Sequence, residues 1–274
     1  MHSLEHIDAF GAGHVGAMVI DAGGAIVGVH GDEDFRFPLA SVTKLLTAMA
    51  IFVAIGERVV ALDDLVGPPR ATVRHLLSHA SGLGMYEPNV ALAQPGAKRI
   101  YSNAGYELLG SHLVMQSKMS FEEYLRLGVL QQLGMTATSC AGSPAHAGVG
   151  TVGDFGRLAA ECMLPTLVGP DQMAEATSVV FPGLEGVVPG FGRQAPCDWG
   201  LGFELKAHKA PHWTGSLNSP RSYGHFGQSG TFILIDPDAG YGLVMLSDRR
   251  FDQWAVEQWP PFCDEVYSEF VRGV

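Results

Sequence analysis

Strand-like patterns lie at both ends of this chain, and helix-like patterns fill the stretch between them. Near the start, two β-rich runs, 16–20 and 25–30, flank the turn sequence Asp-Ala-Gly-Gly, which is typical of a β-hairpin. Period-two patterns return late in the chain, at 202–206, 231–236 and 241–247. The simplest packing is therefore one antiparallel sheet that is built from both chain ends and covered by helices.

The middle of the chain carries most of the helical patterns. Residues 41–55 are helix formers without Gly or Pro, and they are apolar nearly all round, so this helix is expected to be buried. Further helical patterns are found at 73–79, 103–118, 120–133, 152–163 and 253–271, the last interrupted by Pro260 and Pro261. We predict an α+β fold with an inserted helical region.

The length favours a single domain. A chain of 274 residues is long for one average domain of about 150 residues, but no linker or internal repeat divides it. We expect one domain whose sheet part covers about 1–60 and 199–274, and whose inserted helical part covers about 61–198.

Composition and charge argue against several classes of function. With 47% hydrophobic residues the chain is not disordered, and 17 basic against 28 acidic side chains leave no basic footprint for nucleic acid. The longest nearly apolar run, 45–55, is far shorter than the roughly 20 residues that span a bilayer. Residues 1–14 lack the pattern of a secretory signal. We therefore expect a cytoplasmic protein without nucleic-acid or membrane partners.

Cofactor and metal motifs occur only as isolated matches. Residues 11–16 match G-x-G-x-x-G, but a hairpin follows where a dinucleotide site needs a helix. The H-x-x-E-H match at 2–6 lacks a third ligand, and His75 and His79 lack a nearby carboxylate. The cysteines are widely spaced, as expected of free thiols: Cys140, Cys162, Cys197 and Cys263. We expect no metal site and no cofactor.

The pattern Ser41-Val42-Thr43-Lys44 opens the buried helix. A spacing of three places the hydroxyl and the amine on one helical face, and the free N–H groups of the first turn point toward the serine. Apolar surroundings disfavour the charged form of Lys44, which could then accept the serine proton near neutral pH. Taken alone, the tetrapeptide also fits a surface lysine beside an N-capping serine.

Two further segments complete a set that resembles a known superfamily. Tyr101-Ser102-Asn103 lies at a helix start, and His225-Phe226-Gly227 precedes a predicted strand. The order S-x-x-K, Y-x-N and K/H-x-G resembles the serine β-lactamase and penicillin-binding-protein superfamily, in particular class C β-lactamases and their carboxylesterase (family VIII esterase-like) and D-aminopeptidase relatives. Segments 75–83 and 94–110 also resemble its HLLTHTSGL and PGxxxxYSNxGYxLLG sequences. The resemblance implies a β-lactamase/transpeptidase-like fold.

The resemblance also implies roles for individual residues. Ser41 would be the nucleophile, Lys44 its proton partner, and Tyr101 the group that moves protons to and from the leaving atom. Asn103 would orient Lys44 and the substrate. The backbone N–H groups of Ser41 and Gln228 would form the oxyanion hole. Whether Lys44 or Tyr101 is the principal base stays open.

The third motif departs from the usual Lys-Thr-Gly. His225, with an unperturbed pKa of about 6.5, is mostly neutral at pH 7, and Phe226 lacks the hydroxyl of threonine. Gly227 leaves room for close approach of the substrate. The two replacements weaken recognition of anionic acyl donors and favour a neutral ester. The alternative is that His225 is only a hydrogen-bonded loop histidine.

We therefore predict a serine hydrolase that cleaves a carboxylic ester through a Ser41 acyl-enzyme, with Lys44 and Tyr101 as proton-transfer groups. Its partner would be a small-molecule ester or amide. One alternative is a β-lactamase, a D-aminopeptidase or DD-peptidase, or an acyltransferase of the same fold. Another is a catalytically silent binding protein, against which the intact Ser41, Lys44, Tyr101 and Asn103 argue.

Overall fold

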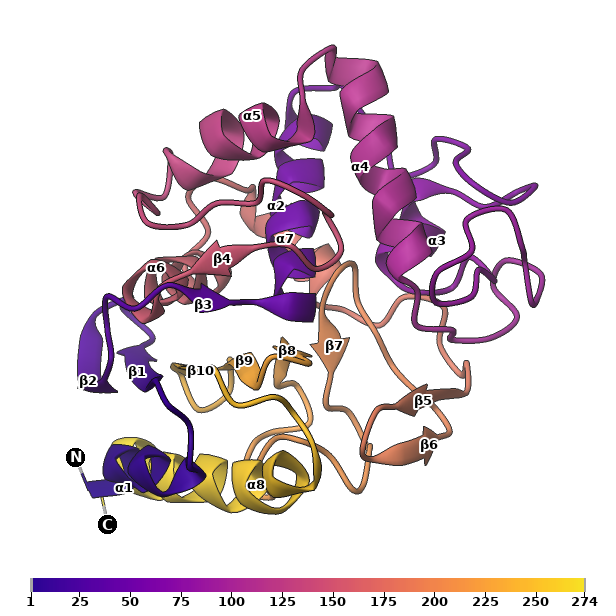
Figure 1. Ribbon diagram of the computed structural model, residues 1–274. Coiled ribbons are helices and arrows are strands. Elements are labelled where there is room, and N and C mark those ends of the chain that lie inside the picture. Colours follow the sequence, from indigo (N-terminus) through magenta and orange to yellow (C-terminus); the bar gives the residue numbers. More distant parts are fainter. Residues whose placement is uncertain (1, 274) are drawn as a thin grey trace.

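The computed structural model describes residues 2–273, and within them a six-stranded antiparallel sheet forms the centre of the fold (Figure 1). The strand order is β2-β1-β10-β9-β8-β7. The strands are β1 (Val15–Asp21), β2 (Ile26–Gly31), β7 (Glu204–Leu205), β8 (Tyr223–Gly227), β9 (Thr231–Asp236) and β10 (Tyr241–Ser247). Because β1 pairs with both β2 and β10, the two ends of the chain share one sheet, which confirms the prediction.

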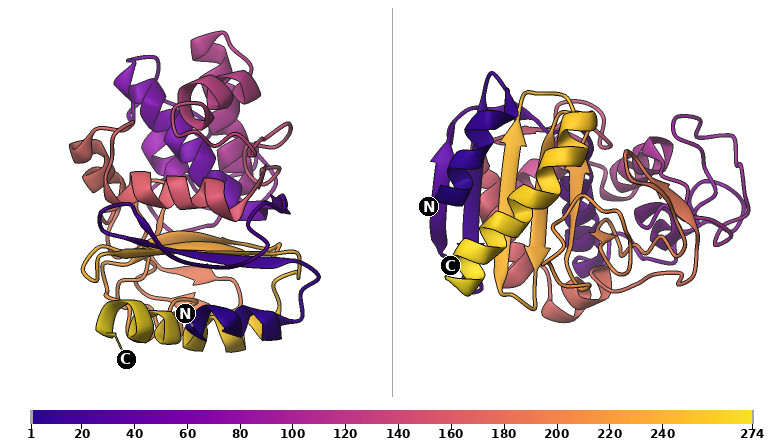
Figure 2. Two further views of the ribbon diagram at one scale, coloured as in Figure 1. Left: turned by 90° about the vertical axis from the view of Figure 1, so that its left-hand side faces the viewer. Right: turned by 90° about the horizontal axis from the view of Figure 1, so that it is seen from below.

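Helices cover both faces of this sheet (Figure 2). One face carries α1 (His2–Glu5), the 3-10 helix η1 (His6–Phe10), α8 (Gln253–Tyr267) and the π-helix η4 (Ser268–Arg272). The other face carries α6 (Val152–Met163), which packs against β1 and β10. Successive side chains of β1 point to opposite faces of the sheet. Ala17 and Val19 therefore pack into the core on the α8 side. Met18 and Ile20 pack into the core on the α6 side.

The remaining helices pack around α2 (Thr43–Gly56), the predicted buried helix. These are α3 (Val73–Leu77), α4 (Asn103–Ser117), α5 (Phe121–Leu125), the π-helix η3 (Arg126–Leu130) and α7 (Pro170–Ala176). Eleven of the 14 residues of α2 are buried, because helices surround it on several sides. The Ser102 side chain caps α4 by accepting a hydrogen bond from the Gly105 N–H.

The structure differs from the sequence-based elements in several places. The segment His225-Phe226-Gly227 precedes β9 as expected, but it also belongs to a strand that was not predicted, β8, which pairs along its length with β9. The strand expected at 202–206 shortens to β7. Helix α8 continues through Pro260 and Pro261 because the packing of its buried side chains outweighs their helix-breaking tendency.

Two small two-stranded sheets were not predicted. Strand β3 (Phe37–Pro38) pairs with β4 (Val149–Gly150), and β5 (Gly186–Val188) pairs with β6 (Gly192–Gln194). Strands of two or three residues are too short to leave a periodic pattern in the sequence. The first of these pairs anchors the segment that leads into α2.

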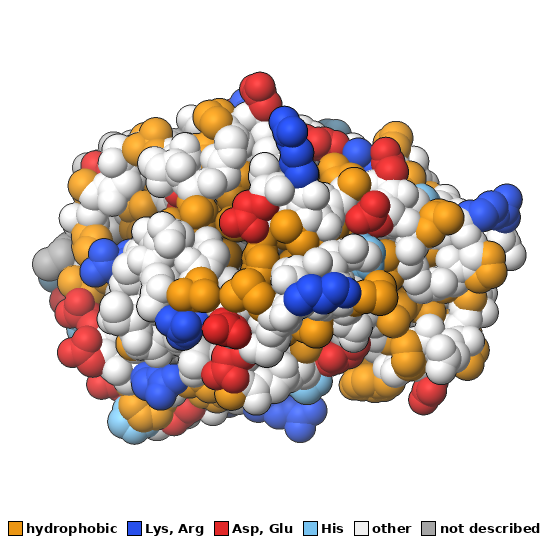
Figure 3. Space-filling view, turned by 90° about the horizontal axis from the view of Figure 1, so that it is seen from above, with side chains coloured by type: hydrophobic (Ala, Val, Ile, Leu, Met, Phe, Trp, Pro, Cys, Tyr) orange, Lys and Arg blue, Asp and Glu red, His pale blue; other side chains and the backbone are white. Residues whose placement is uncertain are grey.

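Figure 3 shows the face at the helical end of the molecule, where acidic and basic side chains are interspersed. Among the residues that the structure describes, no helix has the length and apolarity to cross a membrane. Within the same residues, no group of three or more His, Cys, Asp or Glu side chains could hold a metal ion.

Candidate active site

Ser41 lies in a 3-10 turn, η2 (Ala40–Val42), immediately ahead of α2. The serine was expected in the first turn of the α-helix itself, but that helix begins at Thr43. Ala40 has a φ of +45°, in the left-handed region that residues other than Gly rarely adopt. The Thr231 hydroxyl donates to the Leu39 carbonyl at 3.1 Å and so ties this strained turn to β9.

Lys44 is fully buried and reaches back to Ser41. Its Nζ lies 3.3 Å from Ser41 Oγ, 2.7 Å from Asn103 Oδ1 and 2.9 Å from the Ala145 carbonyl oxygen. Burial lowers the pKa of Lys44 to about 7, although the Glu107 carboxylate acts in the opposite direction. The amine is therefore neutral in a large fraction of molecules at pH 7. In that form its two N–H groups bind the two carbonyl oxygens, and its lone pair is left for the Ser41 hydroxyl.

Tyr101 directly precedes the cap of α4, and its phenol approaches both the serine and the third motif. The phenolic oxygen lies 3.5 Å from His225 Nε2, and the Ser41 hydroxyl is near enough to lower the pKa of the phenol slightly against the effect of burial. Lys44 Nζ is 4.8 Å from the centre of the tyrosine ring. Burial raises the pKa of Tyr101, so the phenol is protonated at neutral pH and can donate a proton.

His225 is 2% exposed, and its hydrogen bonds identify its tautomer. Its Nδ1 lies 2.7 Å from the Phe226 carbonyl oxygen, which can only accept, so Nδ1 carries the hydrogen. Burial and the nearby Lys44 lower the pKa of His225 to about 4. At pH 7 the imidazole is neutral, and its Nε2 presents a lone pair toward Tyr101.

Gly227 is the point at which β8 meets the serine turn. A Cβ at this position would lie 2.3 Å from the Leu39 carbonyl oxygen and 3.3 Å from the Ser41 nitrogen. Only glycine permits this approach of β8 to the Ser41 backbone. The side-chain Nε2 of Gln228 donates to the Phe251 carbonyl at 2.9 Å, which fixes the turn that follows β8.

The structure thus brings together residues from η2, α2, the start of α4, and β8 (Figure 1): Ser41, Lys44, Tyr101, Asn103, His225 and Gly227. Gln228 directly follows Gly227 in the chain. The segments that carry them are far apart in the sequence. Figure 1 shows them meeting where the helical layer contacts the sheet.

Sequence reasoning missed three groups at this site. The Ala145 carbonyl has no side-chain signature. His79, interpreted as structural from sequence, accepts a hydrogen bond from the Ser102 N–H at 3.1 Å and packs 4.4 Å from the Tyr101 ring. Trp199 packs edge-on against both His79 and His225, at 4.7 and 5.5 Å between ring centres. The H-L-L-S-H and W-G-L-G segments were the available signals for these rings.

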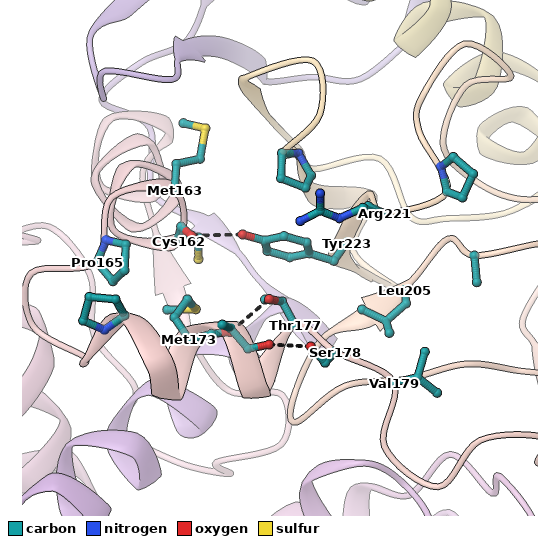
Figure 4. A pocket seen from close by; sticks show the side chains of 15 residues that line it. Cys162, Met163, Pro165, Met173, Thr177, Ser178, Val179, Leu205, Arg221 and Tyr223 are labelled. Atoms are coloured by element: carbon teal, nitrogen blue, oxygen red, sulfur yellow. Dashed lines mark hydrogen bonds between the residues drawn. The ribbon is translucent and has the colours of Figure 1, made fainter.

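Two cavities differ in their relation to the site. One of about 430 Å³ is lined by Tyr101 itself together with Met85, Ile100, Val187 and neighbouring residues. Another of about 540 Å³ lies between the ends of α6 and α7 and strands β7 and β8, where the Tyr223 hydroxyl donates to the Cys162 carbonyl (Figure 4). Its described lining does not include Ser41, Lys44 or Tyr101. The first cavity is therefore the one that adjoins the candidate catalytic groups.

Solved structures of other proteins share the fold of this chain. A β-lactamase crystal structure from Mycobacterium bovis is 45% identical and matches with a TM-score of 0.96 over 98% of this chain and 99% of that chain. An octameric penicillin-binding protein homologue from Pyrococcus abyssi, 18% identical, shares the fold with a TM-score of 0.76 over 98% of this chain and 75% of its own.

Curated sequences give the same result over shorter stretches. A penicillin-binding protein of Bacillus subtilis (strain 168) is 28% identical over 189 residues, which are 55% of this chain and 40% of that protein. The chain spans about half the length of the curated relatives that it matches. The family model described as beta-lactamase matches residues 5–262. The chain belongs to the β-lactamase family, whose fold it has.

Proposed function

We propose that this member of the family cleaves a neutral carboxylic ester through an acyl-enzyme on Ser41. The observation that carries the proposal is the environment of Lys44. Its amine is buried, has a pKa of about 7, and has both N–H groups of its neutral form directed to carbonyl oxygens. Its lone pair is then available to the Ser41 hydroxyl, 3.3 Å away.

Acylation follows from these contacts. Neutral Lys44 takes the Ser41 proton while Oγ attacks the ester carbonyl, and the developing oxyanion accepts hydrogen bonds from the backbone N–H groups of Ser41 and Gln228. Tyr101 donates its phenolic proton to the departing alkoxide oxygen, and the Lys44 ammonium returns a proton to the phenolate. Water then attacks the acyl carbon, gives up one proton by the same route, and releases the acid with Ser41 restored.

The third motif favours a neutral substrate over a carboxylate. His225 is uncharged at pH 7 and is hydrogen-bonded to the backbone, so it offers an approaching carboxylate no cation. The cavity beside Tyr101 has apolar walls at Met85, Ile100 and Val187. Its basic side chains are Lys98, Arg99 and Arg193. The Arg99 guanidinium donates to four backbone carbonyls, and Arg193 pairs with Glu185, so both of these charges already have partners. Such walls suit the hydrocarbon part of an ester.

β-Lactam hydrolysis is the second candidate. The observation that favours it is the 45% identity to a structure described as a β-lactamase. The same nucleophile and proton-transfer groups would open a lactam ring, with the ring nitrogen receiving the Tyr101 proton. An acyltransferase would use these groups with an alcohol in place of water, and a silent binding protein would use none of them.

The test is intact-protein mass after brief mixing with p-nitrophenyl butyrate or benzylpenicillin. Wild type, Ser41→Ala and the control Ser178→Ala, at an exposed serine, are compared while p-nitrophenol release is followed. Ester turnover that disappears only in Ser41→Ala supports the proposal. A lasting penicilloyl adduct with slow ester turnover moves the assignment to the second candidate. Equal ester turnover in Ser41→Ala removes the acyl-enzyme mechanism altogether.

A further inference from the structure

A buried charged cluster lies behind the active site, on the α8 side of strand β7. The Glu204 carboxylate accepts a hydrogen bond from Trp213 Nε1 at 2.7 Å, and lies 3.3 Å from both Lys209 Nζ and His212 Nε2. The side chains of Lys209, Glu204 and His212 are at most 3% exposed. Residue 204 pairs with Gly224 of β8, so the cluster lies one residue from His225 along that strand.

The cluster contains one ion pair. Burial alone would raise the pKa of Glu204, but Lys209 and His212 outweigh it and hold the pKa at about 2. His212 accepts the Thr214 N–H on Nδ1, and burial lowers its pKa, so it is neutral and donates to Glu204 through Nε2. The charges of Glu204 and Lys209 therefore compensate each other. Because desolvation offsets most of the attraction in a buried ion pair, stability alone does not explain why it is present.

The ammonium of Lys209 also holds the backbone on the active-site side. It donates to the Asp198 carbonyl at 2.7 Å and to the Leu205 carbonyl. Asp198 precedes Trp199, and the backbone of Trp199 bridges to that of Glu204. The turn formed by residues 198–205 is thus fastened at both ends by one cation, whose three N–H groups match two carbonyls and one carboxylate.

The residue held by this turn is the aromatic wall of the site. The ring centre of Trp199 lies 5.5 Å from that of His225 and 5.9 Å from that of Tyr101. Tyr101 and His225 approach each other at 3.5 Å, a spacing that depends on the placement of both rings. A displaced indole would leave each ring a wider range of orientations.

We propose that Lys209 and Glu204 are positioning residues of this active site, which hold Trp199 so that it orients the rings of Tyr101 and His225. The inference rests on the proposed function for its kinetic consequences. Its structural part, the placement of the Trp199 indole, does not depend on which substrate is cleaved.

The experiment compares Lys209→Met with the double variant Lys209→Met/Glu204→Gln, which leaves no unpaired charge. The readouts are the thermal midpoint, kcat and KM for p-nitrophenyl butyrate, and the ¹H–¹⁵N resonance of the Trp199 indole, assigned with Trp199→Phe. The control is Lys206→Met, because Lys206 also donates to two carbonyls, those of Gly215 and Asn218, but not to that of Asp198.

We expect Lys209→Met to lower the thermal midpoint, because Glu204 is left buried without its cation. The double variant should recover much of the midpoint, yet keep a shifted Trp199 resonance and a kcat about tenfold below wild type, with KM little changed. Trp199→Phe should show a similar loss of kcat. Lys206→Met should leave the Trp199 resonance and kcat unchanged.

An unshifted Trp199 resonance with wild-type kcat in the double variant overturns the inference. If neither Lys209 variant folds, wild-type kcat in Trp199→Phe overturns it, because there would then be nothing to position, and a reduced kcat supports it. Absence of ester turnover in the wild-type protein would count against the proposed function instead. The shift of the Trp199 resonance between wild type and the double variant would still decide the structural part.

Discussion

The Lys44 amine lies 3.3 Å from the Ser41 hydroxyl, and the two other hydrogen bonds that the structure describes for it end on the carbonyl oxygens of Asn103 and Ala145. A protonated amine could donate to all three oxygens, whereas a neutral amine has one hydrogen fewer. The shortest of the three contacts is made to Asn103. When the Lys44 amine loses its proton, it no longer donates a hydrogen bond to Ser41. Its lone pair can instead accept the hydrogen of the Ser41 hydroxyl.

This geometry predicts the pH dependence of the reaction. Because the pKa of Lys44 is lowered to about 7, kcat/KM for a neutral p-nitrophenyl ester should rise about tenfold per pH unit below 7 and level off above it. His225, with a pKa of about 4, stays neutral over that range. Initial rates from pH 5 to 9 check the prediction. A profile that is level from pH 5.5 upward would assign the proton transfer to another group.

Asn103→Asp should move that profile. A carboxylate 2.7 Å from the amine favours the ammonium form, so the rising limb should shift about one pH unit or more to higher pH, while the plateau is still reached at alkaline pH. The measurement is the same pH series. Asn89→Asp, which adds an equal charge at an exposed position, is the control and should leave the limb in place. If the rising part of the pH profile stays at the same pH in Asn103→Asp, Lys44 is not the group whose proton transfer limits the rate.

Gly227→Ala should reduce both stability and activity. The added Cβ would lie 2.3 Å from the Leu39 carbonyl oxygen and 2.6 Å from Thr231 Oγ1, so β8 and the serine turn must separate. We expect a lower thermal midpoint and a kcat reduced about a hundredfold, as when an oxyanion-hole donor is lost. Gly153→Ala, in helix α6 with no atom within 4 Å of the new Cβ, is the control and should be neutral or stabilising. Wild-type kcat in Gly227→Ala would contradict the role of this contact.

His225→Lys should change substrate preference. A cation at this position can hold a carboxylate, so the ratio of kcat/KM for an anionic over a neutral acyl donor should rise about tenfold or more, the value of one charge-assisted hydrogen bond. A p-nitrophenyl monoester of succinic acid and p-nitrophenyl butyrate are suitable donors. His225→Gln stays neutral and should show no such rise. Equal ratios in the two variants would mean that the imidazole does not limit carboxylate binding.

Part of this site was accessible from the sequence, and the reason is local geometry. The spacing of Ser41 and Lys44 on one helix predicts their contact, because residues three apart share a helical face. Tyr101 and His225 could be added only through the family resemblance, because no local rule relates residues 124 positions apart in the chain. The antiparallel sheet followed from patterns at both chain ends.

Other features left no local signal. The Ala145 carbonyl belongs to the backbone, so its role as an acceptor depends on tertiary packing rather than on residue type. Nothing in the sequence around Lys209 distinguishes it from a surface lysine. It is buried in the structure because Glu204 and two backbone carbonyls compensate the charge of its ammonium group. The register of β8 against β9, which places His225 opposite Ile233, also depends on partners that are remote from the motif.

Arg99→Met should cause a large loss of stability. The Arg99 guanidinium, 4% exposed, donates to the carbonyls of Ser78, Cys197, Val180 and Phe181, which come from separate loops around the site. Burial lowers the pKa of Arg99 to about 10, so it is still a cation at neutral pH. Methionine has a similar length but no donor. Three buried acceptors and one half-buried acceptor would lose their partner, and the free energy of unfolding should fall by about 3 kcal/mol or more.

Urea unfolding of the two arginine variants checks this value. Arg221→Met is the control, because Arg221 forms an exposed pair with Asp238, and its loss should change the free energy of unfolding by about 1 kcal/mol or less. Because Arg99 lies two residues before Tyr101, Arg99→Met should also reduce kcat under conditions in which it remains folded. Equal unfolding midpoints for Arg99→Met and Arg221→Met would show that the loops around the site hold together without the guanidinium.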